Sequence, residues 1–284
     1  CPFLSATLCA WPGSVRDTLL ISLLYAEDKA GSTRSMQIGS LVRELWRGWI
    51  RSSFLTRKMA VKEQSSSTNV AAMRDALTNT AYAQDWTLFL TMCIVYGRCL
   101  VILGDDEFYP RESMDASMPT RNPLTMDELV VLSGLLRNLV FFMHWDNVGM
   151  TGDSEYITGT RMRVDQVREL CTRLLQQLHT RDSRHRFVPE SHWHMLNEND
   201  LTSFIQAVVL EERELAVSQD QDRENHRAPL SAFSQRKRDF MTPRLKVLNN
   251  IPFVNPFDVR VEIFRQFVRN DIQSLGFSRD LFAP

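Results

Sequence analysis

The feature that most constrains the fold is a long apolar segment at residues 86–103. A helix formed by this segment would be hydrophobic on nearly every side, and such a helix is stable in water only when other helices enclose it. We therefore expect a central buried helix here. Its β-branched residues leave a buried strand as the alternative: Ile94, Val95, Val101 and Ile102.

The same segment approaches the length of a membrane-spanning helix, but its charges argue against a membrane location. Arg98 lies inside it, Asp85 precedes it, and residues 105–107 after it are all acidic. Placing an arginine in lipid costs about 3 kcal/mol on insertion scales. We predict a helix buried in protein and no membrane partner.

Most other segments also have apolar residues at spacings of three and four, the period of an amphipathic helix. Thr125 and Glu128 add the reciprocal capping pattern at one helix start. The pattern predicts helices at about 14–30, 38–51, 70–77, 124–145, 162–179 and 201–217. We predict an all-α fold of stacked helical hairpins, either armadillo/HEAT-like or an irregular α-solenoid, with a C-terminal linker helix.

Domain organisation follows from a polar stretch that interrupts the helical pattern after residue 218. We predict a helical scaffold domain at 1–218, a polar linker at 219–250 and a separate helical segment at 251–284. Whether the first 80 residues belong to the scaffold stays open.

Composition excludes several classes of protein. A net charge of -1 with 24% charged and 44% hydrophobic residues is typical of a globular protein and disfavours nucleic acid as partner. The five cysteines are odd in number and lack CxxC spacing, which indicates a reducing compartment, cytoplasmic and/or nuclear. Because the first residue is Cys1 rather than methionine and no basic region follows, we predict an internal fragment without a signal peptide.

Candidate chemical sites are few. The nearest approach to a metal site is a set whose spacing fits no common zinc frame, so packing or surface roles are favoured: Cys171, His185, His192 and His194. No GxSxG, HExxH or glycine-rich phosphate loop occurs. We predict no catalytic residue, no metal and no cofactor in this chain.

Two charged clusters allow either binding or simple solvation. The acidic cluster, which could hold a cation but fits a solvated turn better, is Asp105, Asp106 and Glu107. The basic cluster, which could attract an acidic partner or direct nuclear import but fits a solvated linker better, is Arg236, Lys237, Arg238, Arg244 and Lys246.

The last segment carries the candidate docking surface. Pro252 and Pro256 keep residues 251–257 out of a helix, and an apolar helical stripe follows with Ile263 and Phe267 beside it. The candidate docking residues are Phe257, Val261, Phe264, Val268, Ile272 and Leu275. The helix either packs on its own domain or docks on a following domain, and the proline-containing lead-in favours docking.

Several motifs occur in one order along the chain. They are GDDEF at 104–108, LHTRDSRHRFVP at 178–189, HWHM at 192–195, then Phe204, Glu211 and Glu212, and RLKVLNNIPFVNPFDVRVEIFR at 244–265. Together they resemble the region N-terminal to the HECT domain, plus its first helix, in the proteasome-associated subfamily of HECT-type ubiquitin-protein ligases. The resemblance runs from about residue 86 to the C-terminus. Asn255 departs from it, because relatives usually have an apolar residue there.

The resemblance implies a function for the parent protein. Ubiquitin passes from a conjugating enzyme to a HECT-domain cysteine and then to a substrate lysine, and no cysteine in this chain matches the family's active-site loop. The implied partners are the HECT domain of the same polypeptide, protein substrates, the proteasome, and the conjugating enzyme through the HECT domain. The alternative is a helical-repeat interaction scaffold without ubiquitin chemistry.

Overall fold

The structure is a computed structural model that describes residues 35–59, 67–109, 122–145, 156–196, 198–225 and 242–274. Within these ranges the chain is helical, and the single β-bridge joins Tyr156 to Arg163. The all-α prediction is therefore confirmed. The helix predicted at 14–30 and Leu275 lie outside the described residues. Two compact units divide the chain, residues 1–143 with 148–189 and residues 144–147 with 190–284.

The helices of the first unit follow the apolar period of the sequence. They are α3 (Ser35–Leu45), the π-helical turn η1 (Trp46–Ile50), α4 (Phe54–Met59), α5 (Ser67–Thr78), the 3-10 turn η2 (Thr80–Tyr82), α6 (Ala83–Ile102), α7 (Asp105–Phe108), α8 (Met126–Trp145, whose end enters the second unit) and α9 (Val164–Arg184). The helices predicted from 38 to 179 are confirmed. The strand alternative for 86–103 is wrong.

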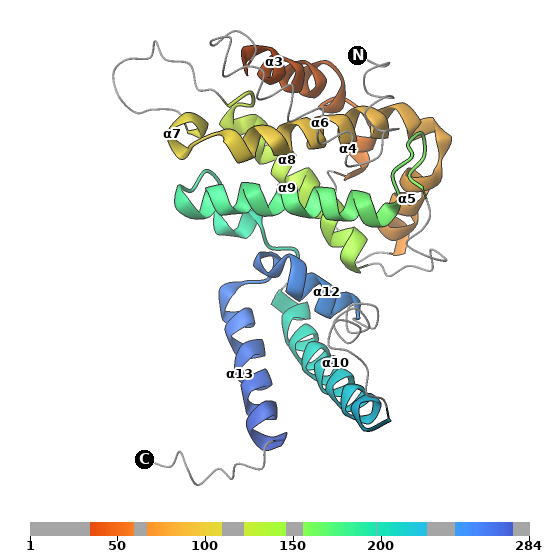
Figure 1. The fold of residues 1–284 in the computed structure, drawn as a ribbon, viewed down its shortest axis with the longest axis vertical. Helices are drawn as coiled ribbons and strands as arrows, with labels where there is room; N and C mark the ends of the chain where they lie inside the picture. Colours follow the sequence, from red (N-terminus) through yellow and green to blue (C-terminus); the bar gives the residue numbers. More distant parts are fainter. Residues whose placement is uncertain are drawn as a thin grey trace. The chain divides into compact units, whose positions relative to one another are not determined.

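Helix α6 is the centre of the first unit. It packs against α3 on one side and α9 on the other (Figure 1). Trp86, Leu90 and Cys93 on α6 are fully buried, and the indole nitrogen of Trp86 donates to the carbonyl oxygen of Ala76 at 2.6 Å. Of the described residues, Thr80–Ile102 alone has the length and composition of a membrane span, and 61% of its apolar window is buried inside the protein.

At the start of α8, Glu128 takes part in both a helix cap and a contact with a residue far away in the sequence. The amide of Thr125 donates to Glu128 Oε2 at 2.9 Å, and the amide of Glu128 donates to Thr125 Oγ1 at 3.3 Å, as the capping pattern predicts. Arg47 of η1 binds both oxygens of the same carboxylate, at 2.5 and 3.0 Å. Burial alone would raise the pKa of Glu128, but the bonds from Arg47 and Thr125 outweigh it and lower that pKa.

The second unit contains the end of α8 and three further helices. These are α10 (Glu198–Asn225), α12 (Pro243–Asn250) and α13 (Phe257–Ser274), with the 3-10 turns η3 (Glu190–His192) and η4 (Pro252–Val254). Residues 243–250, placed in a polar linker by the sequence, form a helix with Leu245 and Val247 buried. Helix α10 groups with α13 rather than with the first unit. The three-part division at residues 218 and 250 stays a prediction.

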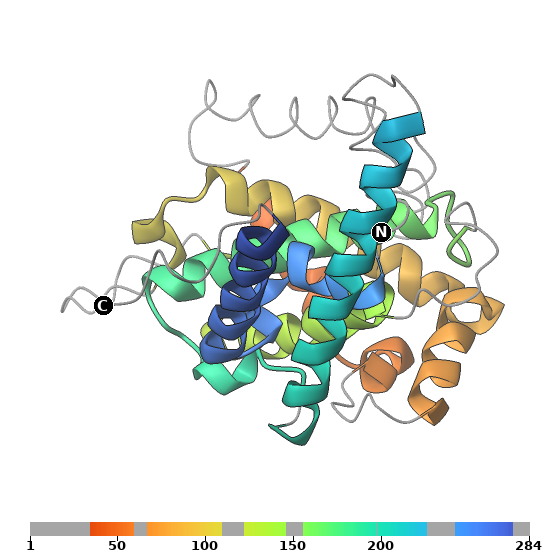
Figure 2. The same cartoon turned by 90° about the horizontal axis from the view of Figure 1, so that it is seen from below.

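A small core holds the second unit together. Helices α10 and α13 lie side by side in both views (Figures 1 and 2). Their buried residues meet those of α12 in one cluster consisting of Phe204, Val208, Leu245, Val259 and Ile263. Trp145 at the end of α8 stacks on Phe204, with ring centroids 6.1 Å apart. One side of α13 therefore packs in a core to which three other helices, α8, α10 and α12, contribute residues.

Asn255, the position that departs from the resembled family, is buried without hydrogen bonds from its side chain. Its exposed fraction is 0%, and neither Oδ1 nor Nδ2 has a partner among the described residues. A buried unpaired amide costs free energy that an apolar side chain of similar size would not. The backbone there is extended, at φ -103 and ψ 141, which suits valine.

We therefore predict that Asn255→Val raises the free energy of unfolding of the second unit by about 1–2 kcal/mol. Urea unfolding followed by circular dichroism measures this change. Asn255→Asp is the opposite control, because it buries a charge and should destabilise the unit. A valine variant of unchanged or lower stability would mean that the amide is satisfied in solution.

Candidate functional site

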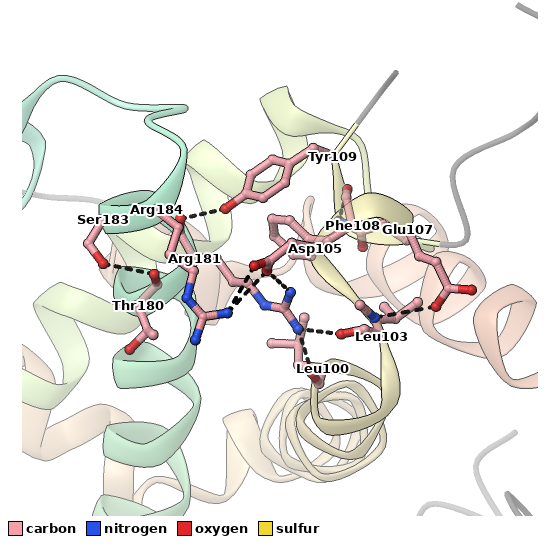
Figure 3. Close-up of polar contacts among 12 residues, drawn as sticks. Leu100, Leu103, Asp105, Glu107, Phe108, Tyr109, Thr180, Arg181, Ser183 and Arg184 are labelled. Atoms are coloured by element: carbon pink, nitrogen blue, oxygen red, sulfur yellow. Dashed lines mark hydrogen bonds and ion pairs between the residues drawn. The ribbon is translucent and has the colours of Figure 1, made fainter. Parts of the chain in front are cut away.

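Two motifs that lie far apart in the sequence meet in the first unit. Asp105, from the GDDEF motif, begins α7, and Arg181 and Arg184, from the LHTRDSRHRFVP motif, lie in the last turn of α9. Both arginines bind the Asp105 carboxylate, Arg184 through Nη1 at 3.0 Å from Oδ2 (Figure 3). We call this group, with Phe108 and Tyr109, the Arg181 clasp.

Arg181 is the centre of the clasp. Its Nη2 donates to the carbonyl oxygens of Leu100, at 3.0 Å, and Leu103, which belong to the C-terminal end of α6 (Figure 3). These carbonyls have no partner within their own helix. The guanidinium lies 5.2 Å from the Phe108 ring centre, and the Tyr109 hydroxyl donates to the Arg181 carbonyl oxygen. Arg181 therefore ties α6, α7 and α9 together.

Asp182 fixes the chain that follows α9. This buried carboxylate accepts hydrogen bonds from the amides of Phe187, at 2.8 Å, and Val188, at 3.1 Å. The Phe187 ring lies 6.4 Å from that of Phe108. Arg181 therefore binds the end of α6, whereas Asp182, the next residue of the motif, binds the loop after α9.

The protonation states of Asp105 and Tyr109 suit a structural role for the Arg181 clasp. Burial would raise the pKa of Asp105, but the hydrogen bonds from Arg184 and Arg181 outweigh it, so that pKa lies below its usual value. Burial, with the charge of Asp105, raises the pKa of Tyr109 to about 12. At neutral pH both groups keep their ordinary protonation, and neither is poised for general acid or base catalysis. The side chain of Asp105 is 44% exposed, as expected for a solvated turn, and two arginines hold its carboxylate.

The residues considered for metal binding have other neighbours. His185 packs against Tyr109 with ring centroids 4.8 Å apart, His192 packs against Trp193 at 5.2 Å, and Cys171 is buried. Across the described ranges, no group of three or more His, Cys, Asp or Glu side chains could hold a metal ion. Among the described residues, Cys93, Cys99 and Cys171 form no disulfide.

The part of the basic cluster that the structure describes is engaged within the second unit. Arg244 Nη1 donates to Glu211 Oε1 at 2.6 Å, and its guanidinium lies 5.5 Å from the Trp145 ring centre. The hydroxyl of Thr242 donates to the other oxygen of Glu211. Arg244 therefore joins α12 to α10, whereas residues 236–238 lie outside the described ranges.

Helix α13 has two apolar faces. The inner face, with Val259 and Ile263 at 7% and 1% exposure, belongs to the core of the second unit, and Phe267 packs against that core. The outer face contains exposed Phe257, Phe264 and Val268, at 60%, 66% and 37%, with half-buried Val261 and Ile272. Ile263 and Phe267, which the sequence placed beside the predicted stripe, belong to the inner face. The structure separates packed residues from available ones.

Docking by the outer face stays a prediction, but its residues are placed where a partner could reach them. Arg260 lies beside the face with its guanidinium 5.4 Å from the Phe257 ring centre, and Arg265 lies 3.9 Å from Glu262.

The Arg181 clasp was not predicted from the sequence. The available signal was the pair of arginines in the last turn of a helix, where they can bind carbonyl oxygens.

Comparison with known proteins gives relatives but neither a family model nor a solved structure that matches. A probable E3 ubiquitin protein ligase of Schizosaccharomyces pombe is 30% identical over 194 residues, 68% of this chain and 17% of the relative. Ubiquitin-protein ligase E3B of Homo sapiens is 26% identical over 189 residues, 66% of this chain and 13% of the relative. The mouse protein of the same name matches equally. This chain is therefore similar, over about two thirds of its length, to a small part of proteins named E3 ubiquitin ligases.

Proposed function

We propose that this chain is a non-catalytic helical segment of a HECT-type ubiquitin-protein ligase of the proteasome-associated subfamily. The similarity to proteins named E3 ubiquitin ligases supports the ligase role, and the motifs between residues 104 and 265 support the HECT type. In the parent protein, ubiquitin passes from a conjugating enzyme to a cysteine of the HECT domain and then to lysines of protein substrates. The conjugating enzyme contacts that domain rather than this chain.

The outer face of α13 carries the proposal. A helix that is apolar on two faces needs a partner for each, and α10 and α12 cover the inner face but leave Phe257 and Phe264 exposed on the other. Contiguous exposed apolar side chains on a folded protein mark an interface. We propose that the HECT domain of the same polypeptide covers Phe257, Phe264 and Val268.

The rest of the chain supports that arrangement. The first unit, tied by the Arg181 clasp, provides a rigid body that holds protein substrates or the proteasome near the catalytic domain. Cys93, Cys99 and Cys171 form no disulfide among the described residues, which is compatible with a parent protein that works in the cytoplasm and/or nucleus. Every proposed partner is a protein.

The test uses the full-length parent protein with Phe264→Asp and Val268→Asp together. Two carboxylates would have to be desolvated for the HECT domain to dock, so we predict that ubiquitin transfer to a substrate falls by about tenfold or more. Gel assays of the thioester with ubiquitin and of substrate ubiquitination measure the two steps separately.

Leu210→Asp is the matched control. Leu210 lies on α10 of the same unit and is 57% exposed, so its replacement removes a comparable exposed side chain away from α13. Unchanged transfer by the double variant, or an equal loss with Leu210→Asp, would reject the docking role. The alternative function is a helical scaffold without ubiquitin chemistry. Sequencing the gene beyond the codon for residue 284 distinguishes it from the proposed ligase, because only the ligase would encode a HECT domain there.

A further inference from the structure

The π-helical turn η1 in the first unit presents a tryptophan to solvent. Trp46 and Ile50 of this turn are buried at 0% and 2% exposure, whereas Trp49 is 51% exposed. π-Helical turns are rare and occur disproportionately at functional sites. A large aromatic side chain left half in water is likewise more typical of a binding surface than of a packed core.

Gly48, next to Trp49, has no packing reason to be glycine. A Cβ atom added there would meet no atom within 4 Å, and Gly48 is exposed. Glycine inside a helix is destabilising because the unfolded chain has more freedom to lose. Bare backbone beside an exposed indole leaves room for another chain to approach closely.

The segment that contains η1 has an excess of basic residues. Residues 35–59 contain five basic side chains and one acidic side chain, Glu44, although the whole chain has a net charge of -1. Arg47 pairs with Glu128, and Lys58 pairs with Asp75. Within the part of the chain that the structure describes, the other three basic side chains have no carboxylate at ion-pair distance: Arg43, Arg51 and Arg57.

We propose that Arg47, Gly48, Trp49 and Arg51, the Trp49 surface, bind an acidic segment of another protein. Arginine matches carboxylates with paired N–H donors, and Trp and Arg are the residues that most often dominate the binding energy of protein interfaces. Arg51, which has no carboxylate at ion-pair distance among the described residues, selects an acidic partner over a neutral or basic one, whereas Arg47 would exchange Glu128 for a carboxylate of that partner. A single-stranded nucleic acid would need a series of aromatic platforms, whereas η1 exposes one.

The test measures binding of a short fluorescein-labelled peptide of alternating glutamate and leucine to the whole chain by fluorescence anisotropy. We expect saturable binding that Trp49→Ala and Arg51→Glu each weaken by about tenfold or more. Tyr156→Ala and Arg173→Glu are the matched controls, because both lie in the first unit with 60% exposure for Tyr156 and 71% for the Arg173 side chain. Gly48→Ala should raise the melting temperature and weaken peptide binding.

Several outcomes would overturn the assignment. The proposal fails if the peptide does not bind, or if the Trp49→Ala variant binds the peptide with unchanged affinity. An equal loss in Arg173→Glu would show that only overall charge matters, and an equal loss in Tyr156→Ala would show that the effect is not specific to the Trp49 surface. A single-stranded oligonucleotide that binds as tightly as the peptide, with the same dependence on Trp49, would assign the surface to nucleic acid instead. None of these results depends on ubiquitin transfer, so the Trp49 surface and the proposed docking of α13 are tested separately.

Discussion

Replacing Arg181 with alanine is expected to lower the free energy of unfolding of the first unit by about 2–4 kcal/mol. The side chain of Arg181 is only 12% exposed, and its loss leaves the carbonyl oxygens of Leu100 and Leu103 without their donor at the end of α6. Asp105 would lose its more buried partner at the same time. Urea unfolding followed by circular dichroism measures the change.

Arg184→Ala is the matched control for this prediction. Arg184 binds the same carboxylate, but its side chain is 57% exposed and donates to no helix carbonyl in the clasp. An exposed ion pair contributes about 0–1 kcal/mol, so this variant should unfold almost as the parent does. Arg181→Lys should recover only part of the loss, because an ammonium group lacks the planar fork that reaches several acceptors. Equal effects of the two alanine variants would mean that Arg181 acts only as an ion-pair partner.

The second large effect contrasts two adjacent residues of α13. Ile263→Asp places a carboxylate at a position with 1% exposure, facing Phe204 and Val208, and is expected to destabilise the second unit by about 3–5 kcal/mol. Phe264→Asp changes a side chain that is 66% exposed, and stability should change by less than about 0.5 kcal/mol. The two substitutions therefore separate packing from docking on one helix.

Amide hydrogen exchange along α10 and α13 measures this contrast, because it reports local opening helix by helix. Faster exchange throughout both helices is expected for the Ile263 variant only. Similar protection in both variants would show that Ile263 is not in the core, and strong loss in the Phe264 variant would show that the outer face is already packed within the chain.

The helical fold could be predicted from the sequence because its signals are local. The apolar period placed α6, α8 and α9 within a few residues, and Thr125 with Glu128 marked the start of α8. Helix α12 was missed because it has only eight residues, and its three apolar positions, Leu245, Val247 and Leu248, are too few to stand out in a polar stretch. Polar composition was therefore a poor guide to the chain between α10 and α13.

The candidate sites depended on contacts that no local pattern contains. Arg181 and Asp105 are separated by 76 positions, so their pairing follows from the packing of α9 on α6. The docking role predicted for the apolar stripe of α13 stays a prediction, and the residues that pack in the core are Val259 and Ile263. Which face is free depends on Phe204 and Leu245, which fill the other side from separate helices. A stripe in one helix cannot indicate which of its residues another helix has already covered.

Glu128 has a consequence for how the first unit opens. One carboxylate closes the N-terminal cap of α8 through Thr125 and holds Arg47 on the turn that carries Trp49. Fraying of α8 at this end breaks the hold on η1, and withdrawal of η1 removes a charge partner that favours the cap. The two segments, more than 70 positions apart, are therefore thermodynamically linked. An acidic segment that pulls Arg47 away from Glu128 would loosen the beginning of α8 as it binds.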